Sequence, residues 1–155
     1  MPRVILYDAI TPEEDMPKLY RSAHAFVLMS RGEGMGMPYL EAGACGLPVI
    51  GTACTAQLDF LNEDNSWLVE PDSFESSEIA DSREINMAKQ CRFYEGQDFP
   101  VFGHNSLEQA QEAMREVYDD YDRAKEKGER FRQDICESFT WNHTVNMITD
   151  RLEEL

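Results

Sequence analysis

The stretch SRGEGMGMPYLEAGACGLPVIGT, Ser30–Thr52, decides the fold. The run AFVLM at 25–29 precedes it and the run LPVIG at 47–51 lies near its end. Both runs are apolar without alternation, which predicts fully buried strands. Between them, PYLEAGACG at 38–46 has a proline at its start and a glycine at its end, a pattern that predicts a short helix. Strands of this kind separated by short helices are typical of a parallel α/β sheet covered on both faces.

The rest of the chain supplies further strands and helices. The steps of three and four between apolar residues in the second half predict amphipathic helices. Polar helix caps and glycines give their expected ends. We therefore predict buried strands at 3–7 and 66–70, a helix capped by Thr11 and disturbed by Pro17, a helical turn within 56–64, a loop at 99–105, an amphipathic helix over 106–127 that Gly128 ends, a helix over 129–137, and a last helix capped by Thr140.

Composition restricts the class of protein. The chain has 155 residues, 42% of them hydrophobic, which is enough for a single domain over residues 1–155. The net charge of −16 argues against nucleic acid and anionic membrane surfaces as partners. No apolar run is long enough to span a membrane, and the N-terminus does not resemble a signal peptide. We expect a cytoplasmic protein with four reduced cysteines and no metal site, because the cysteines and histidines lack ligand spacing.

The glycine-rich loop of the opening stretch is the candidate binding segment. It connects a strand to a helix, so it should cross the carboxyl edge of the sheet, where open α/β sheets bind ligands. Free N–H groups and the positive dipole end at the start of the helix favour a phosphate. Gly32, Gly34 and Gly36 would let a ligand approach the backbone.

Two glutamates, Glu33 and Glu41, lie eight positions apart in this stretch. On one helix they would be about 12 Å apart along the axis, whereas a hydrolytic acid and base pair needs roughly 5–9.5 Å between its carboxyls. With a helix that starts at Pro38, Glu41 falls in the first turn and Glu33 in the loop. Two interpretations stay open: both glutamates face one ligand, or Glu41 complements the helix dipole while Glu33 pairs with Arg31.

These residues resemble a known family. The E-x7-E spacing from Glu33 to Glu41 and the run EAGACGLPVIGT, 41–52, resemble the C-terminal Rossmann domain of group 1 (family 4) retaining glycosyltransferases, which have the two-domain GT-B architecture. The resemblance covers residues 3–70 well and 104–155 more loosely, while 72–103 looks like a divergent insertion. It implies a partial doubly wound, Rossmann-like parallel sheet followed by C-terminal helices.

The resemblance also implies a function. It implies retaining transfer of a sugar from a nucleotide-diphosphate sugar donor to a glycan or other acceptor, with no cofactor and no metal. Glu33 would be the catalytic residue, stabilising positive charge on the sugar, and Glu41 would accept hydrogen bonds from the ribose. The donor would be bound by Gly34, Met35, Gly36, Met37 and Pro38, with backbone N–H groups around Gly34 to Met37 meeting the sugar or the diphosphate.

Some parts of the family pattern are missing. An N-terminal Rossmann domain, two strands and an Arg and a Lys that clamp the diphosphate would precede Arg3. Without those strands, the predicted strand 3–7 has three outcomes: it pairs with 25–29, it pairs with another chain, or the sheet edge stays open and prone to self-association. Two other functions remain open: a non-catalytic acidic interaction module or inactive fragment, and a sugar-nucleotide epimerase. The E-x7-E spacing favours the transferase over the epimerase.

Overall fold

The computed structural model describes residues 3–76 and 96–154 and contains a three-stranded parallel sheet. The sheet order is β1-β2-β3, and Phe26 is in register with Val49 while Ile50 is in register with Trp67. The three strands are β1 (Phe26–Leu28), β2 (Val49–Thr52) and β3 (Trp67–Val69). Each overlaps a predicted apolar run, and β2 extends one residue beyond its run to Thr52. The prediction of a mixed α/β fold with a parallel sheet is confirmed.

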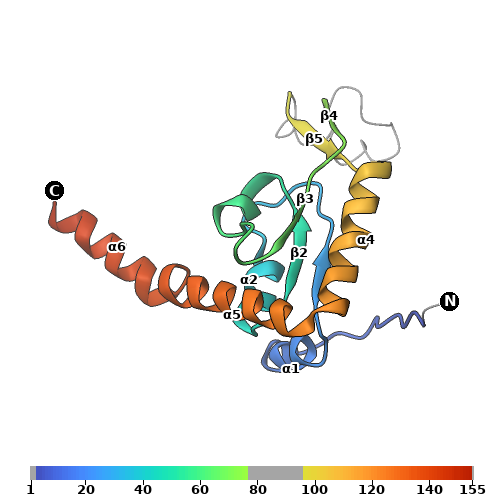
Figure 1. Ribbon diagram of the computed structural model, residues 1–155. Helices are drawn as coiled ribbons and strands as arrows, with labels where there is room; N and C mark the ends of the chain where they lie inside the picture. The colour runs from blue at the N-terminus through green and yellow to red at the C-terminus, as the bar shows by residue number, and fades with distance from the viewer. Residues whose placement is uncertain (1–2, 77–95, 155) are drawn as a thin grey trace.

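Helices cover both faces of this sheet (Figure 1). Helices α2 and α5 pack against one another on one face, and α4 packs against β2 and β3 on the other. Two short 3-10 turns complete the elements. The helical elements are η1 (Glu13–Asp15), α1 (Met16–Arg21), α2 (Met37–Ala44), η2 (Thr55–Asp59), α4 (His104–Asp119), α5 (Tyr121–Ser138) and α6 (Trp141–Glu153).

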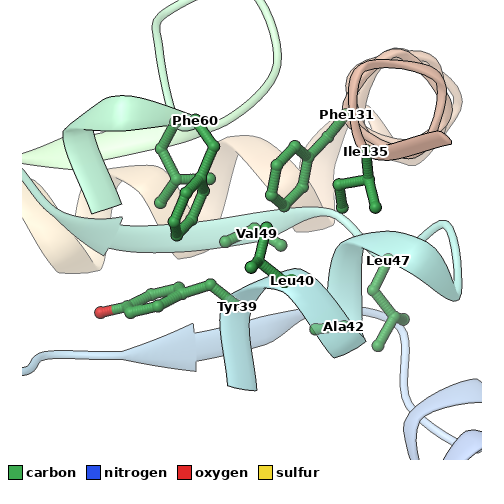
Figure 2. Packing of buried hydrophobic residues seen from close by; sticks show 9 residues of the cluster. Tyr39, Leu40, Ala42, Leu47, Val49, Phe60, Phe131 and Ile135 are labelled. Atoms are coloured by element: carbon green, nitrogen blue, oxygen red, sulfur yellow. The ribbon is translucent and has the colours of Figure 1, made fainter. Parts of the chain in front are cut away.

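The two faces of the sheet carry separate hydrophobic clusters, because successive side chains of a strand point to opposite sides. In β2, Val49 belongs to the cluster with α2 and α5, and its neighbour Ile50 belongs to the cluster with α4. Figure 2 shows the first cluster, where the Phe131 and Phe60 rings stack at 5.9 Å. The buried members of the first cluster are Tyr39, Leu40, Ala42, Leu47, Val49, Phe60, Leu61, Phe131 and Ile135; those of the second are Ile50, Trp67, Val69, Ala110, Ala113, Val117 and Ala124.

Helix α2 begins and ends close to the predicted positions. Its N-cap is Gly36, so the helix begins at Met37, one residue earlier than predicted. Pro38 is therefore its second residue and not its first. After the C-cap at Cys45, Gly46 takes a left-handed conformation with a φ of 77°, which confirms its role in ending the helix.

The predicted strand at 3–7 is wrong. Residues 3–7 form no strand, and the side chains of Val4 and Leu6 are 89% and 87% exposed. Among the described residues β1 pairs only with β2, so it does not pair with 3–7, and pairing with another chain or an open edge stay as predictions. A strand is stable only with a neighbour that satisfies its backbone hydrogen bonds, and apolar composition cannot supply one.

The predicted cap at Thr11 is also wrong. Helical structure begins with Pro12 as N-cap, and α1 follows with Pro17 in its first turn.

The long helices differ from the prediction at one glycine. Helix α4 ends at Asp119, and α5 begins at Tyr121, where the Asp120 carboxylate accepts a hydrogen bond from the Arg123 N–H. Gly128 then lies within α5 and does not end it. A Cβ atom at Gly128 would lie 2.6 Å from the carbonyl oxygen of Gly46, so the glycine permits close packing of α5 on the segment before β2.

A two-stranded antiparallel sheet lies between β3 and α4 in the sequence. It pairs β4 (Ser73–Ser76) with β5 (Asp98–Val101). The predicted loop at 99–105 is therefore wrong at both ends, since 99–101 lie in β5 and 104–105 begin α4. Asp72 joins this hairpin to α4, because its carboxylate accepts hydrogen bonds from the N–H groups of Gly103, Asn105 and Ser106. The hydrogen bond that the Ser106 hydroxyl donates to Asp72, together with these backbone bonds, holds the pKa of Asp72 well below its usual range. Most of the divergent insertion, 77–95, lies outside the described residues.

The last helix confirms its predicted cap, since the Thr140 hydroxyl accepts a hydrogen bond from the His143 N–H. Helix α6 extends away from the sheet (Figure 1) and has no buried residue, so the side chains of Trp141 and Leu152 are 85% and 65% exposed. In the part of the chain that the structure describes, no helix is both long and apolar enough to cross a membrane.

We predict that Gly128→Ala destabilises the fold. Alanine at an exposed helical position normally stabilises by about 1 kcal/mol over glycine. Here the added Cβ meets backbone atoms of Gly46, Leu47 and Pro48 at 2.6–2.9 Å. We expect the free energy of unfolding to fall by about 1–3 kcal/mol, as for other overpacked sites, measured by urea denaturation. The control is Gln133→Ala at an exposed position of the same helix. An unchanged or higher urea midpoint in Gly128→Ala would contradict the close packing.

Candidate functional site

The loop between β1 and α2 lies at the carboxyl edge of the parallel sheet, as the sequence predicted. Tyr39 fixes its position, because this fully buried residue of α2 donates a hydrogen bond from its hydroxyl to the Leu28 carbonyl at 2.7 Å. Burial raises the pKa of Tyr39, and the nearby charge of Glu33 acts in the same direction, while hydrogen bonds around the hydroxyl oppose both. The first turn of the helix is therefore tied to the end of β1.

Glu33 lies half-buried in this loop, and the structure anchors it through its backbone. Its N–H donates to the Thr55 hydroxyl oxygen at 3.3 Å. Three residues earlier, the Ser30 carbonyl accepts a hydrogen bond from the Thr52 hydroxyl at 2.9 Å. The anchors are the last residue of β2 and the first residue of η2, so this part of the chain determines where the loop carrying Glu33 runs.

The glycines of the loop have different roles. Gly36 has a φ of 73°, and an added Cβ would lie 3.0 Å from the Tyr39 ring, so both conformation and space favour glycine there. A Cβ at Gly32 or Gly34 would meet no atom within 4 Å. The surface beside them is open to a ligand, and the side chains of Met35 and Met37 are about half exposed next to it.

Glu41 lies in α2, but not in its first turn as predicted. It is the fifth residue of the helix, which begins before Pro38. The Tyr20 hydroxyl of α1 donates a hydrogen bond to its Oε2 atom at 2.8 Å. Burial raises the pKa of Tyr20, and the hydrogen bond to the Glu41 carboxylate raises it further.

Arg31 connects the loop to the hairpin. Its Nε donates to the carbonyl oxygen of Pro100 in β5 at 3.0 Å. The hairpin thus touches the residue two positions before Glu33. The sequence did not indicate this contact, because Arg31 and Pro100 are 69 residues apart.

The predicted site residues share one continuous segment, but Glu33 and Glu41 have different neighbours. Thr55 holds the Glu33 backbone, and Tyr20 holds the Glu41 carboxylate. Sequence reasoning assigned no role to Tyr20, Thr55 or Gln57. Local sequence gives no signal for Gln57, because its side chain is fully buried while the adjacent Leu58 and Asp59 are exposed.

Other candidate features lie elsewhere. Within residues 3–76 and 96–154, no three His, Cys, Asp or Glu side chains group as a metal site. Cys45, Cys54 and Cys136 are free thiols, as predicted, and Cys91 lies outside the described residues. A hollow of about 380 Å³ lined by His24, Met114, Val117, Tyr118 and Tyr121 lies near the start of β1, at the opposite end of that strand from Glu33. His24 packs there edge-on against Tyr121, with ring centroids 5.4 Å apart.

Comparison with known proteins identifies the family. The family described as "Glycosyl transferases group 1" matches residues 1–83, which is more than half of the chain. The chain belongs to the group 1 glycosyltransferases. The site loop and both glutamates lie within the matched residues, and membership places this chain among proteins that transfer sugars.

Curated relatives agree with this family. O-antigen chain mannosyltransferase B of Escherichia coli is 46% identical over 52 residues, which are 34% of this chain and 14% of that protein. D-inositol 3-phosphate glycosyltransferase of Corynebacterium jeikeium (strain K411) is 28% identical over 130 residues, which are 83% of this chain and 31% of that protein. This glycosyltransferase chain thus spans less than a third of the length of either relative.

A solved structure is also similar. The crystal structure of the GtfA/B complex is 20% identical, with a TM-score of 0.33, and the match covers 78% of this chain and 23% of that chain. A likeness of this size carries no argument about the site or its chemistry.

We predict that Tyr20 makes the stability of this group 1 glycosyltransferase chain fall at alkaline pH. The pKa of Tyr20 is raised in the fold, whereas the unfolded chain releases tyrosine protons from about pH 10. The unfolded state therefore binds fewer protons than the folded state above pH 10, and the free energy of unfolding falls as the pH rises. Tyr20→Phe should make this fall less steep in urea denaturation between pH 8 and 11. Equal slopes in wild type and Tyr20→Phe would contradict the raised pKa of Tyr20.

Proposed function

We propose that this chain is the donor-binding half of a retaining, family 4 glycosyltransferase of GT-B architecture. It would bind a nucleotide-diphosphate sugar and present the sugar for transfer to an acceptor. One observation carries the proposal: the loop with Glu33 meets the start of α2 at the carboxyl edge of the parallel sheet. This edge is where open α/β sheets bind their ligands.

The start of α2 suits an anionic group of the donor. A helix start presents N–H groups without helical partners and the positive end of the helix dipole. The open backbone at Gly34 and the left-handed turn at Gly36 supply further N–H groups close by. We propose that the segment from Gly34 to Pro38 binds the donor through these groups, at the diphosphate or the sugar hydroxyls.

The two glutamates would then have different tasks. Glu33 would be the catalytic residue, because a fixed carboxylate beside the sugar stabilises positive charge that develops as the bond to the diphosphate breaks. Glu41 would accept hydrogen bonds from the ribose hydroxyls. A carboxylate has about four acceptor positions, so the Tyr20 bond to Oε2 leaves acceptor capacity for a ribose.

The remaining parts of the reaction are also proposals. The acceptor would bind to an N-terminal Rossmann domain, and an Arg and a Lys would clamp the leaving diphosphate without a metal. Both relatives extend well beyond the matched part, since the match covers 14% of one and 31% of the other. We propose a cytoplasmic location.

One observation favours an alternative. The Glu41 carboxylate already has a partner in Tyr20, and a chain that had lost donor binding would keep such a purely structural bond. The alternative function is a non-catalytic acidic interaction module with the same fold. Sugar transfer or donor hydrolysis by this chain would exclude it.

Isothermal titration calorimetry tests the proposal with UDP, GDP and ADP and with UDP-glucose and GDP-mannose. We expect one nucleotide to bind weakly and Glu41→Ala to lower its affinity about 10-fold or more, because a hydrogen bond to a charged group is worth about 1.5–3 kcal/mol. Glu112→Ala, at an exposed position of α4, is the matched control. The proposal fails if no nucleotide binds, or if Glu41→Ala binds as well as wild type.

A further inference from the structure

Thr55 has an unusual backbone conformation. Its φ is 56°, and it is the one non-glycine residue with a positive φ in the described part of the chain. A β-branched residue in the left-handed region is strained. Such strain persists where the surrounding contacts require it, and it is concentrated at functional sites. Packing of its side chain does not explain the strain, because Thr55 is exposed.

The Thr55 hydroxyl connects the loop of Glu33 to a buried amide. It accepts the Glu33 N–H at 3.3 Å and donates to Oε1 of Gln57 at 2.9 Å. The Gln57 side chain is fully buried, and its Nε2 donates to the Thr52 hydroxyl oxygen at 2.6 Å. Thr52 in turn donates to the Ser30 carbonyl at 2.9 Å.

The donors and acceptors in this chain of bonds fit in one direction only. The Thr52 hydrogen is used on a carbonyl, so its oxygen must accept from the amide nitrogen of Gln57. The Thr55 hydroxyl then donates its hydrogen to the amide oxygen and accepts the Glu33 N–H. Turning the Gln57 amide over would place its oxygen against the Thr52 oxygen, whose hydrogen is already used, so the bond between these two residues would be lost. The network thus holds the loop through hydrogen bonds at two points, the Ser30 carbonyl and the Glu33 N–H.

We propose that Thr55 and Gln57 are positioning residues that hold the Ser30–Glu33 backbone so that the Glu33 carboxylate faces the sugar of the donor. The sugar part of this inference rests on the proposed function; the grip on the loop does not. Since the network touches Glu33 and leaves Glu41 untouched, it governs binding of the sugar and leaves binding of the nucleotide unchanged.

The test compares Thr55→Val, which keeps the shape and removes the hydroxyl, with Thr55→Ser, which keeps the hydroxyl. Thr149→Val is the control, because it removes a hydroxyl from exposed α6. The first readout is amide hydrogen exchange at Glu33 by NMR, without ligand. We expect exchange about fivefold faster in Thr55→Val, as for the loss of one hydrogen bond, and wild-type rates in the other two variants. Wild-type exchange in Thr55→Val would overturn the proposal.

The second readout is calorimetry with UDP, GDP, UDP-glucose and GDP-mannose. One of these nucleotide sugars is expected to bind wild type. We expect Thr55→Val to lower its affinity about fivefold and to leave the affinity of the corresponding nucleoside diphosphate unchanged. An equal loss for both ligands, or no loss, overturns the proposal. If wild type binds none of these probes, the proposed function fails, and the exchange at Glu33 alone then decides whether Thr55 holds the loop.

Discussion

The packing of Tyr39 is the constraint on which the rest of the structure depends. Its ring fills the space between β1, β2 and α2, with Phe26 and Phe60 against it. A Cβ at Gly51 would lie 2.8 Å from that ring, so β2 must carry a glycine at this point. Because the hydroxyl also bonds the last residue of β1, one side chain sets the spacing of strand, loop and helix. The position of the candidate-site loop therefore depends on the position of the Tyr39 ring.

Local sequence predicted those elements whose stability comes from burial along a continuous run. The three strands and α2 are of this kind, because apolar runs and a terminal glycine describe them fully. The segment 3–7 has the same composition and forms no strand, since a strand also needs a neighbour and none adjoins it. Gly128 was misread for a related reason: its role is close approach to Gly46, a contact between residues 82 positions apart that no local pattern reveals.

The candidate site, like the fold, was predictable where local sequence determines it and not where distant residues meet. The loop, its glycines and its place at the sheet edge followed from one stretch of sequence. The contacts that orient it did not, because Tyr20 to Glu41 and Thr55 to Glu33 each join residues about 20 positions apart. Polar side chains that make such contacts do not recur at regular intervals in the sequence, so no periodic pattern predicts them. Each glutamate therefore depends on a different segment, so a substitution near one need not disturb the other.

The β1 edge that is unpaired among the described residues and the charge of the chain oppose each other when copies meet. An unpaired strand edge is a template for pairing with another molecule, while a net charge of −16 keeps copies apart. This repulsion reaches about 30 Å at 0.01 M ionic strength and about 8 Å at 0.15 M. Added salt therefore shortens the range of the repulsion that opposes pairing at this edge.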